Sequence, residues 1–100
     1  ASRIIAALHL LALPFAAGAA TLADKFTPET PYYFDNFDPG QQPWKPGQHL
    51  NIEEVFKNYQ YYEIVLDQNG KEITVNQYIR GVKTGSEKYL ESPDGSLRKK

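Results

Sequence analysis

The feature that most constrains the fold is the dipeptide Asn69-Gly70, which lies between two segments of alternating apolar and polar residues. Asn-Gly is the strongest short signal for a two-residue β-hairpin turn, because both turn positions require a positive φ. With this turn at the tip, residues 60–79 form a hairpin with one apolar and one mostly polar face. The predicted pairs are Gln68 with Lys71, Asp67 with Glu72, Leu66 with Ile73, Val65 with Thr74, Ile64 with Val75, Glu63 with Asn76, Tyr62 with Gln77 and Tyr61 with Tyr78. The sequence therefore predicts an antiparallel sheet covered on one face.

A short helix is expected just before the hairpin. Asn51 followed by Glu54 has the outline of a capping box and predicts a helix over residues 52–58. The apolar residues spaced to line one face of this helix are Ile52, Val55, Phe56 and Tyr59. We expect that face to cover the apolar side of the sheet.

A third strand is expected over residues 87–91, after a polar link bracketed by Gly81 and Gly85. Three strands with one covered face are stable where two rarely are. The predicted fold class is α+β: a small antiparallel β-hairpin or three-strand meander with one short helix, over residues 51–97. An irregular arm and an N-terminal hydrophobic helix precede it.

The arm covers residues 24–50 and is rich in proline and aromatic side chains. Each proline removes a backbone donor and fixes its own φ, which excludes a regular helix or a central strand. A disordered linker would lack the aromatic residues, so their side chains are expected to be buried against something. Two alternatives remain open: the arm lies along a partner's surface, or it folds back over its own domain. Its candidate partner-binding residues are Tyr32, Tyr33, Phe34, Phe37 and Trp44.

Residues 4–23 are apolar or small throughout, apart from one histidine and one threonine. As a helix with a rise of ~1.5 Å per residue, this stretch reaches about 30 Å, the thickness of a bilayer's hydrocarbon core. It is either a transmembrane anchor or a secretory signal with Arg3 as positive start and residues 17–20 as small-residue exit. We favour a retained anchor over residues 1–23, because the chain opens with Ala1 and lacks methionine, as an already processed N-terminus would.

A retained anchor has consequences for topology and for His9, the only ionisable side chain within it. Arg3 and the free amine keep the N-terminus inside, so a single-pass protein places the domain after Asp24 on the opposite periplasmic, lumenal or intermembrane side. An imidazole in lipid needs a partner. His9 is therefore a candidate ligand of a haem iron or a chlorophyll magnesium, with a bond to a backbone carbonyl as the alternative.

Composition argues against several functional classes. The formal net charge of -1 gives no long-range field, so no nucleic-acid partner is expected, and the basic residues 98–100 are expected to form a solvated tail. The absence of cysteine excludes disulfides and thiolate metal sites. His49 is the only histidine outside the apolar stretch, and no serine has the setting of an activated nucleophile. We expect no metal site, no catalytic residue and no enzyme activity. An enzyme that uses His49 alone as a base is the lowest-ranked alternative.

Two functional hypotheses rank above that enzyme. The first is a non-catalytic accessory or structural subunit of a larger membrane complex, anchored by one helix and docked through the arm and the β domain. This outline is similar to that of accessory subunits of respiratory and photosynthetic membrane complexes. The second is a small secreted or periplasmic binding module, cleaved after Ala19 or Ala20, with Tyr61 and Tyr78 as its contact face. A tyrosine pair suits that role because it offers apolar ring faces and polar edges.

Overall fold

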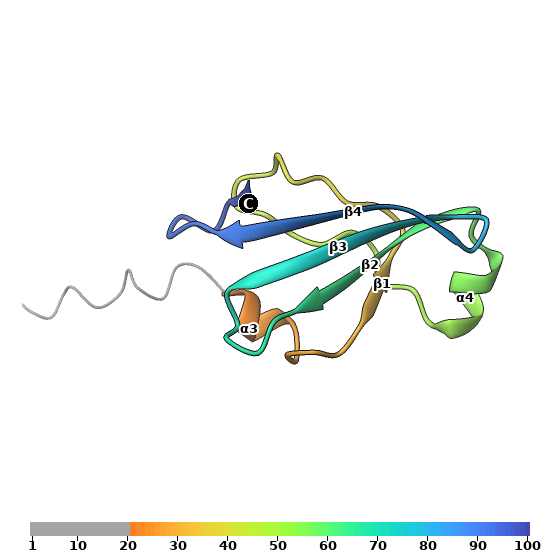
Figure 1. The fold of residues 1–100 in the computed structure, drawn as a ribbon, viewed down its shortest axis with the longest axis horizontal. Coiled ribbons are helices and arrows are strands. Elements are labelled where there is room, and N and C mark those ends of the chain that lie inside the picture. The colour runs from red at the N-terminus through yellow and green to blue at the C-terminus, as the bar shows by residue number, and fades with distance from the viewer. Residues whose placement is uncertain (1–20) are drawn as a thin grey trace, which may run out of the picture.

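Five strands form one antiparallel sheet within residues 21–100, the part of the chain that the computed structural model describes. Every strand pairs with the next one in sequence, so the order across the sheet is β1-β2-β3-β4-β5 (Figure 1). The strands are β1 Tyr32–Phe34, β2 Gln60–Leu66, β3 Glu72–Ile79, β4 Val82–Glu91 and β5 Leu97–Lys99. The helices are α3 Leu22–Lys25 and α4 Ile52–Lys57. The predicted meander is thus extended by one strand at each edge.

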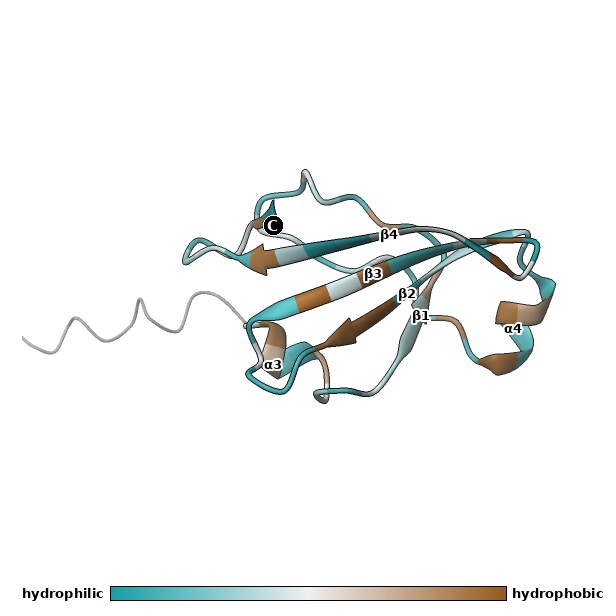
Figure 2. Cartoon of the chain, viewed as in Figure 1, coloured by the Kyte–Doolittle hydropathy of each residue, from teal (hydrophilic) through white to brown (hydrophobic). Residues whose placement is uncertain are grey.

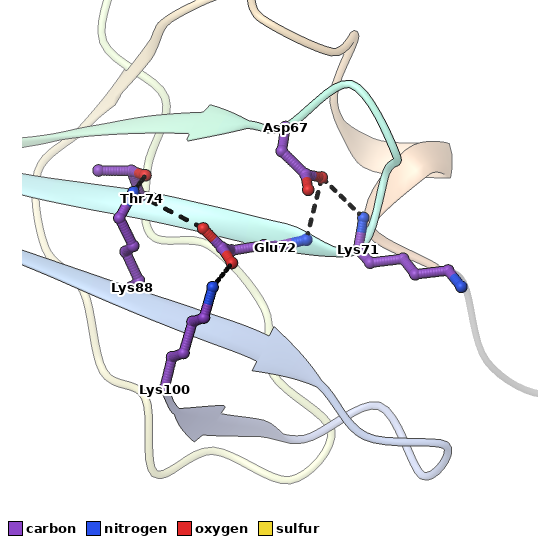
Figure 3. A network of polar contacts seen from close by, with 6 residues as sticks. All are labelled: Asp67, Lys71, Glu72, Thr74, Lys88 and Lys100. Carbon is purple, nitrogen blue, oxygen red and sulfur yellow. Dashed lines mark hydrogen bonds and ion pairs between the residues drawn. The ribbon is translucent and has the colours of Figure 1, made fainter.

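The β2–β3 hairpin has the predicted register, including Tyr61 opposite Tyr78 and Glu63 opposite Asn76, but its turn differs. The predicted two-residue turn is wrong, because Gly70 takes φ +73° whereas Asn69 does not take a positive φ. The connection is instead a longer loop held by the Asp67 carboxylate. Its Oδ1 accepts the backbone N–H groups of Lys71 at 3.0 Å and Glu72 at 3.1 Å (Figure 3).

The β3–β4 connection is the tight turn that was expected one hairpin earlier. Arg80 and Gly81 take φ values of +53° and +77°, the two positive angles that a two-residue turn with the correct twist requires. Residues 87–91 are in a strand as predicted, but β4 already begins at Val82. The predicted polar link up to Gly85 is therefore wrong. A register shift opposite Gln77 and Tyr78 marks a bulge in this pair of strands.

The core lies between the sheet and the preceding arm. Phe34 and Trp44 from the arm are 4% and 2% exposed and pack with Ile64, Leu66 and Val75 of the sheet. The second alternative for the arm therefore holds: it folds back over its own domain, and its β1 adds an edge strand beside β2. The expectation that the short helix covers the sheet is wrong.

α4 forms where predicted but lies beyond one end of the sheet (Figure 1). Its capping box is present, with the Asn51 side chain accepting the Glu54 N–H and the Glu54 carboxylate accepting the Asn51 N–H, both at 2.9 Å. Val55 is the only residue of this helix that is buried. The helix is therefore stable through its cap and one anchoring side chain, and leaves most of its surface open.

α3, the first element of the described residues, begins inside the stretch expected to be an anchor. Leu22 is fully buried in the core, and its backbone N–H donates to Glu91 Oε1 at 3.1 Å. Leu22 thus belongs to the domain. His9 and the rest of the predicted anchor or signal, through residue 20, lie outside the described residues. Among the helices of residues 21–100, none has the length and apolar character needed to cross a bilayer.

The predicted solvated tail is wrong, since residues 97–99 form β5 and the Lys100 N–H donates to the Lys88 carbonyl at 2.9 Å. Figure 3 shows the polar network that ties this end to β3. Glu72 accepts Lys100 Nζ at 2.7 Å and lies 3.6 Å from Lys88 Nζ, which also donates to Thr74 Oγ1 at 3.0 Å. The basic end of the chain is thereby part of the sheet.

Candidate functional site

The predicted partner-binding residues fall into two groups. The Phe34 and Trp44 side chains are occupied in the chain's own core, and Tyr32 and Phe37 are half-buried against it. The Phe37 ring packs edge-on against Trp44, with centroids 5.9 Å apart. The second group comprises Tyr33, Tyr61 and Tyr78, which lie together on the sheet face opposite the core.

These three tyrosines form a cluster across β1, β2 and β3. The rings of Tyr61 and Tyr78 are stacked, with centroids 5.1 Å apart and an interplanar angle of 4°. Tyr33 meets Tyr61 edge-on, with centroids 5.9 Å apart and an angle of 73°. The stack follows from the cross-strand pairing of Tyr61 and Tyr78, and the chain's own rings occupy part of the apolar surface that a ligand would use.

A polar row lies beside the tyrosine cluster. The Tyr33 hydroxyl donates to Glu63 Oε2 and the Asn76 amide donates to Glu63 Oε1, both at 2.9 Å. Burial, followed by the bond to Glu63, raises the pKa of Tyr33 to about 12. Burial also raises the pKa of Tyr78, with further contributions from the nearby charge of Glu63 and from Tyr61. The row stabilises a neutral, hydrogen-bonded tyrosine face, which is suited to contact and not to proton transfer near neutral pH.

Within residues 21–100, the large apolar residues with the greatest exposure lie at the end of the domain formed by α4 and the β3–β4 turn. Four large apolar residues are exposed there, namely Ile52 at 64%, Phe56 at 83%, Tyr59 at 61% and Val82 at 63%. We call these four residues the end surface. Figure 2 shows hydrophobic segments on α4, away from the apolar part of β2 that faces the core. Exposed apolar residues scattered singly are common, whereas several at one end of a small domain make that end a candidate interaction surface.

A groove of about 630 Å³ runs through this end of the domain. Its lining includes Phe56 and Tyr59 of the end surface, the buried Val55 beneath them, and Tyr61 of the tyrosine cluster. Tyr61 therefore connects the predicted contact face with the end surface.

The groove carries positive charge. The Arg80 guanidinium lies over the Tyr59 ring at 5.4 Å, and the Arg80 N–H donates to the Tyr59 carbonyl at 2.8 Å. Lys57 also lines the groove, and Lys83 follows Val82 of the end surface in the chain. Aromatic and apolar walls with cations at the rim suit an apolar segment that carries acidic side chains.

His49 is the only histidine within residues 21–100. His49 is exposed at the arm, where its ring packs edge-on against Phe34 and Tyr32 with centroids 5.6 and 6.2 Å apart. In this part of the chain, no three His, Cys, Asp or Glu side chains are grouped closely enough to hold a metal ion. His9, the candidate haem or chlorophyll ligand, lies outside the described residues.

Sequence reasoning missed the end surface. The spacing of Ile52, Val55 and Phe56 correctly predicts a helix, but a two-turn helix can bury either side of such a stripe. One available signal was the short connection from Lys57 to β2 at Gln60, which leaves α4 little reach back over the sheet. The Glu63 and Asn76 pair was within the predicted register, whereas Tyr33 joined them only through β1.

Comparisons with known protein families, characterised proteins and solved structures found no match to this chain.

Proposed function

We propose that this protein is a non-catalytic binding module that docks on a larger protein through its end surface. The observation that supports this most directly is the group of four large apolar side chains that are each more than half exposed at one end of the domain. Full burial of a large apolar side chain is worth about 1.5–3 kcal/mol relative to full exposure, and these side chains are only partly covered. A partner that covers the end surface would recover part of that free energy.

The chemistry of the groove indicates what the partner presents. Arg80 and Lys57 favour acidic groups at the rim of the partner's contact surface. Phe56 and Tyr59 favour an apolar or aromatic side chain at the centre of that surface. Tyrosine and arginine are also the residues that most often contribute strongly to binding at interfaces. Tyr61 extends the proposed contact area toward Tyr78 on the open sheet face.

The start of the domain supports the secreted or periplasmic form of this module. Thr21 is the N-cap of α3, and its backbone N–H donates to Asp24 Oδ2 at 2.9 Å. A cleavage after Ala20 would leave every described element intact, together with the buried Leu22. In this proposal residues 1–20 act as a secretory signal.

An accessory subunit of a membrane assembly is the second candidate. The end surface lies at the opposite end of the domain from α3, where the apolar stretch joins (Figure 1). In a protein anchored through its N-terminus, this arrangement would leave the end surface free to bind a larger neighbour of the respiratory or photosynthetic kind. Intact mass of the native protein separates the candidates, because cleavage removes about two kilodaltons. Release into a carbonate wash would contradict the anchored form.

Docking is tested with the double variant Ile52→Ser/Phe56→Ser, produced as the full chain in the native host. Both side chains are exposed, so the variant should keep the thermal midpoint of the natural protein. We expect natural protein to elute from a size-exclusion column in a larger species, and the variant to elute at the volume of the free chain.

The matched control is Ala23→Ser, an exposed position on α3 at the other end of the domain. It should elute with the larger species. A double variant that stays in that species would contradict the proposed end surface, and so would natural protein that elutes alone.

A further inference from the structure

A second feature, separate from the end surface, lies along the outer edge of β4. β5 pairs with β4 only from Tyr89 to Glu91, and Lys100 adds one bond to Lys88. Residues 82–87 of β4 therefore have β3 on one side and no described strand on the other. An unpaired strand edge offers its backbone groups to any extended segment that approaches it.

The backbone hydrogen bond from Lys100 to Lys88, just beyond β5, indicates how the free backbone groups of β4 are oriented. Alternate residues of a strand direct both their N–H and C=O to the same side. Because the Lys88 carbonyl accepts from Lys100 on the outer side, Ser86 also directs its N–H and C=O outward. Ser86 is exposed, so these two groups are accessible. The three-residue edge strands β1 and β5 show that pairing of this length is sufficient in this sheet.

A pocket of about 220 Å³ opens on the core side of the same edge. Its aromatic lining is Phe37, Tyr62 and Tyr89, with Phe37 edge-on to Tyr89 at a centroid separation of 5.2 Å. The pocket exists because Gly85 has no side chain at a position that faces the core side, level with Gln77. A Cβ built on Gly85 would lie 3.8 Å from Gln77 Oε1, the nearest atom, so the space in front of it is free.

Glu87 is the only charged side chain that lines the pocket, and its carboxylate is paired with Lys99 Nζ at 3.1 Å. Both side chains of this pair are at least half exposed, so the pair is weak and a second cation can share or replace Lys99. Aromatic rings next to a carboxylate bind an ammonium or guanidinium group through cation–π attraction and charge.

We propose that the outer edge of β4 binds an extended peptide segment of a partner, with one basic side chain of that segment held in the aromatic pocket. The segment adds a strand beside residues 85–87 and exchanges backbone hydrogen bonds with Ser86. Its residue opposite Ser86 points to the open face of the sheet. The next residue along therefore points to the core side, where Gly85 and Glu87 leave room for a lysine or arginine.

This proposal does not depend on the end surface, because it uses other residues. The probe is a fluorescent, capped peptide of alternating threonine and valine with one central lysine, titrated with the full-length protein by fluorescence anisotropy. A second peptide carries glutamate at the centre. We expect the glutamate peptide to bind at least about tenfold more weakly, the factor that corresponds to ~1.4 kcal/mol. Equal affinity for the two peptides would overturn the proposal.

Two variants separate the pocket from the edge. Gly85→Val fills the pocket, because the added side chain projects into it from a backbone that does not need a positive φ. It should weaken the lysine peptide about tenfold while natural stability is kept. Ser86→Pro removes the outward N–H and should abolish binding. Ser86→Val keeps that N–H and serves as the matched control, with affinity within about twofold of the natural protein.

Lys99→Ala gives a result of opposite sign. Removal of the resident cation frees Glu87, so the lysine peptide should bind about threefold more tightly. Unchanged affinity in both Gly85→Val and Lys99→Ala would overturn the pocket assignment. The protein could instead self-associate in a way that Ser86→Pro abolishes, while failing to bind the peptide. That result would identify a second copy of this chain as the occupant of the edge and would overturn the proposal.

Discussion

The hydroxyl of Tyr33 on β1 donates to the carboxylate of Glu63 on β2 at 2.9 Å, directly across the pair that joins the two strands. Glu63 in turn accepts the amide of Asn76 on β3, so one carboxylate links three strands on the open face. Asn76 is only 8% exposed, although its side chain lies on the sheet face opposite the core. The neighbouring side chains on the open face therefore shield it from solvent.

Stability should fall at high pH because of Tyr33. Its pKa is raised from 10.0 to about 12, so the folded state favours the neutral phenol more than the unfolded state does. This contribution is present in full below pH ~10 and is lost as the pH rises through the folded pKa. Urea titrations should show the free energy of unfolding decreasing across that window, and less steeply in Tyr33→Phe. The variant also loses about 1 kcal/mol at neutral pH through its missing bond. Equal slopes would contradict this assignment.

Leu22 should matter for stability, although it lies in the stretch that resembles a membrane anchor. Its side chain is fully buried, so Leu22→Ala should lower the free energy of unfolding by about 2–5 kcal/mol, measured by chemical denaturation. A chain that starts at Thr21 should keep natural stability, and one that starts at Thr27 should unfold. Ala23→Ser is exposed and should change stability by less than about 0.5 kcal/mol. A stable chain starting at Thr27 would show that α3 is dispensable.

The Glu72 network should make stability sensitive to acid and to salt. The hydrogen bond from Lys100 is the largest cause that lowers the pKa of Glu72 below its usual 4.5, and the charges of Lys100 and Lys88 add to it. A lowered carboxyl pKa stabilises the fold above the unfolded value and loses this effect as the pH falls through the folded one. Below pH 4.5 the thermal midpoint of Glu72→Gln should fall less steeply than that of the natural protein. Added salt should reduce the difference in thermal midpoint between the variant and the natural protein.

Two glycines should respond in opposite ways to alanine. A Cβ on Gly47 would lie 2.8 Å from the Asn36 carbonyl oxygen and closer still to the Asn36 side chain, so this loop would have to move. Gly47→Ala should therefore destabilise the protein by about 1–3 kcal/mol. At Gly85 the nearest atom is 3.8 Å away, and Gly85→Ala should stabilise it by ~0.4–1 kcal/mol by restricting the unfolded chain. Thermal melts of the two variants test the pair, and equal midpoints would contradict it.

The candidate sites were only partly predictable. The stacked pair of Tyr61 and Tyr78 follows from the hairpin register, which is a local property of the chain. The end surface does not follow from it, because the exposure of Phe56 depends on where α4 lies relative to the sheet. The pocket at Gly85 is equally non-local, since its aromatic wall combines Phe37 of the arm with Tyr62 and Tyr89 of two strands that are not adjacent.

By itself, the sequence determined the register of β2 and β3 and the cap of α4. Both depend on contacts within about twenty residues, where alternation and a capping pair leave one low-energy arrangement. Only the tertiary structure decided that Phe34 and Trp44 are buried while Phe56 is exposed, because side-chain burial depends on where the arm crosses a sheet formed later in the chain. Apolar residues of similar hydrophobicity carry no local signal that distinguishes those two outcomes.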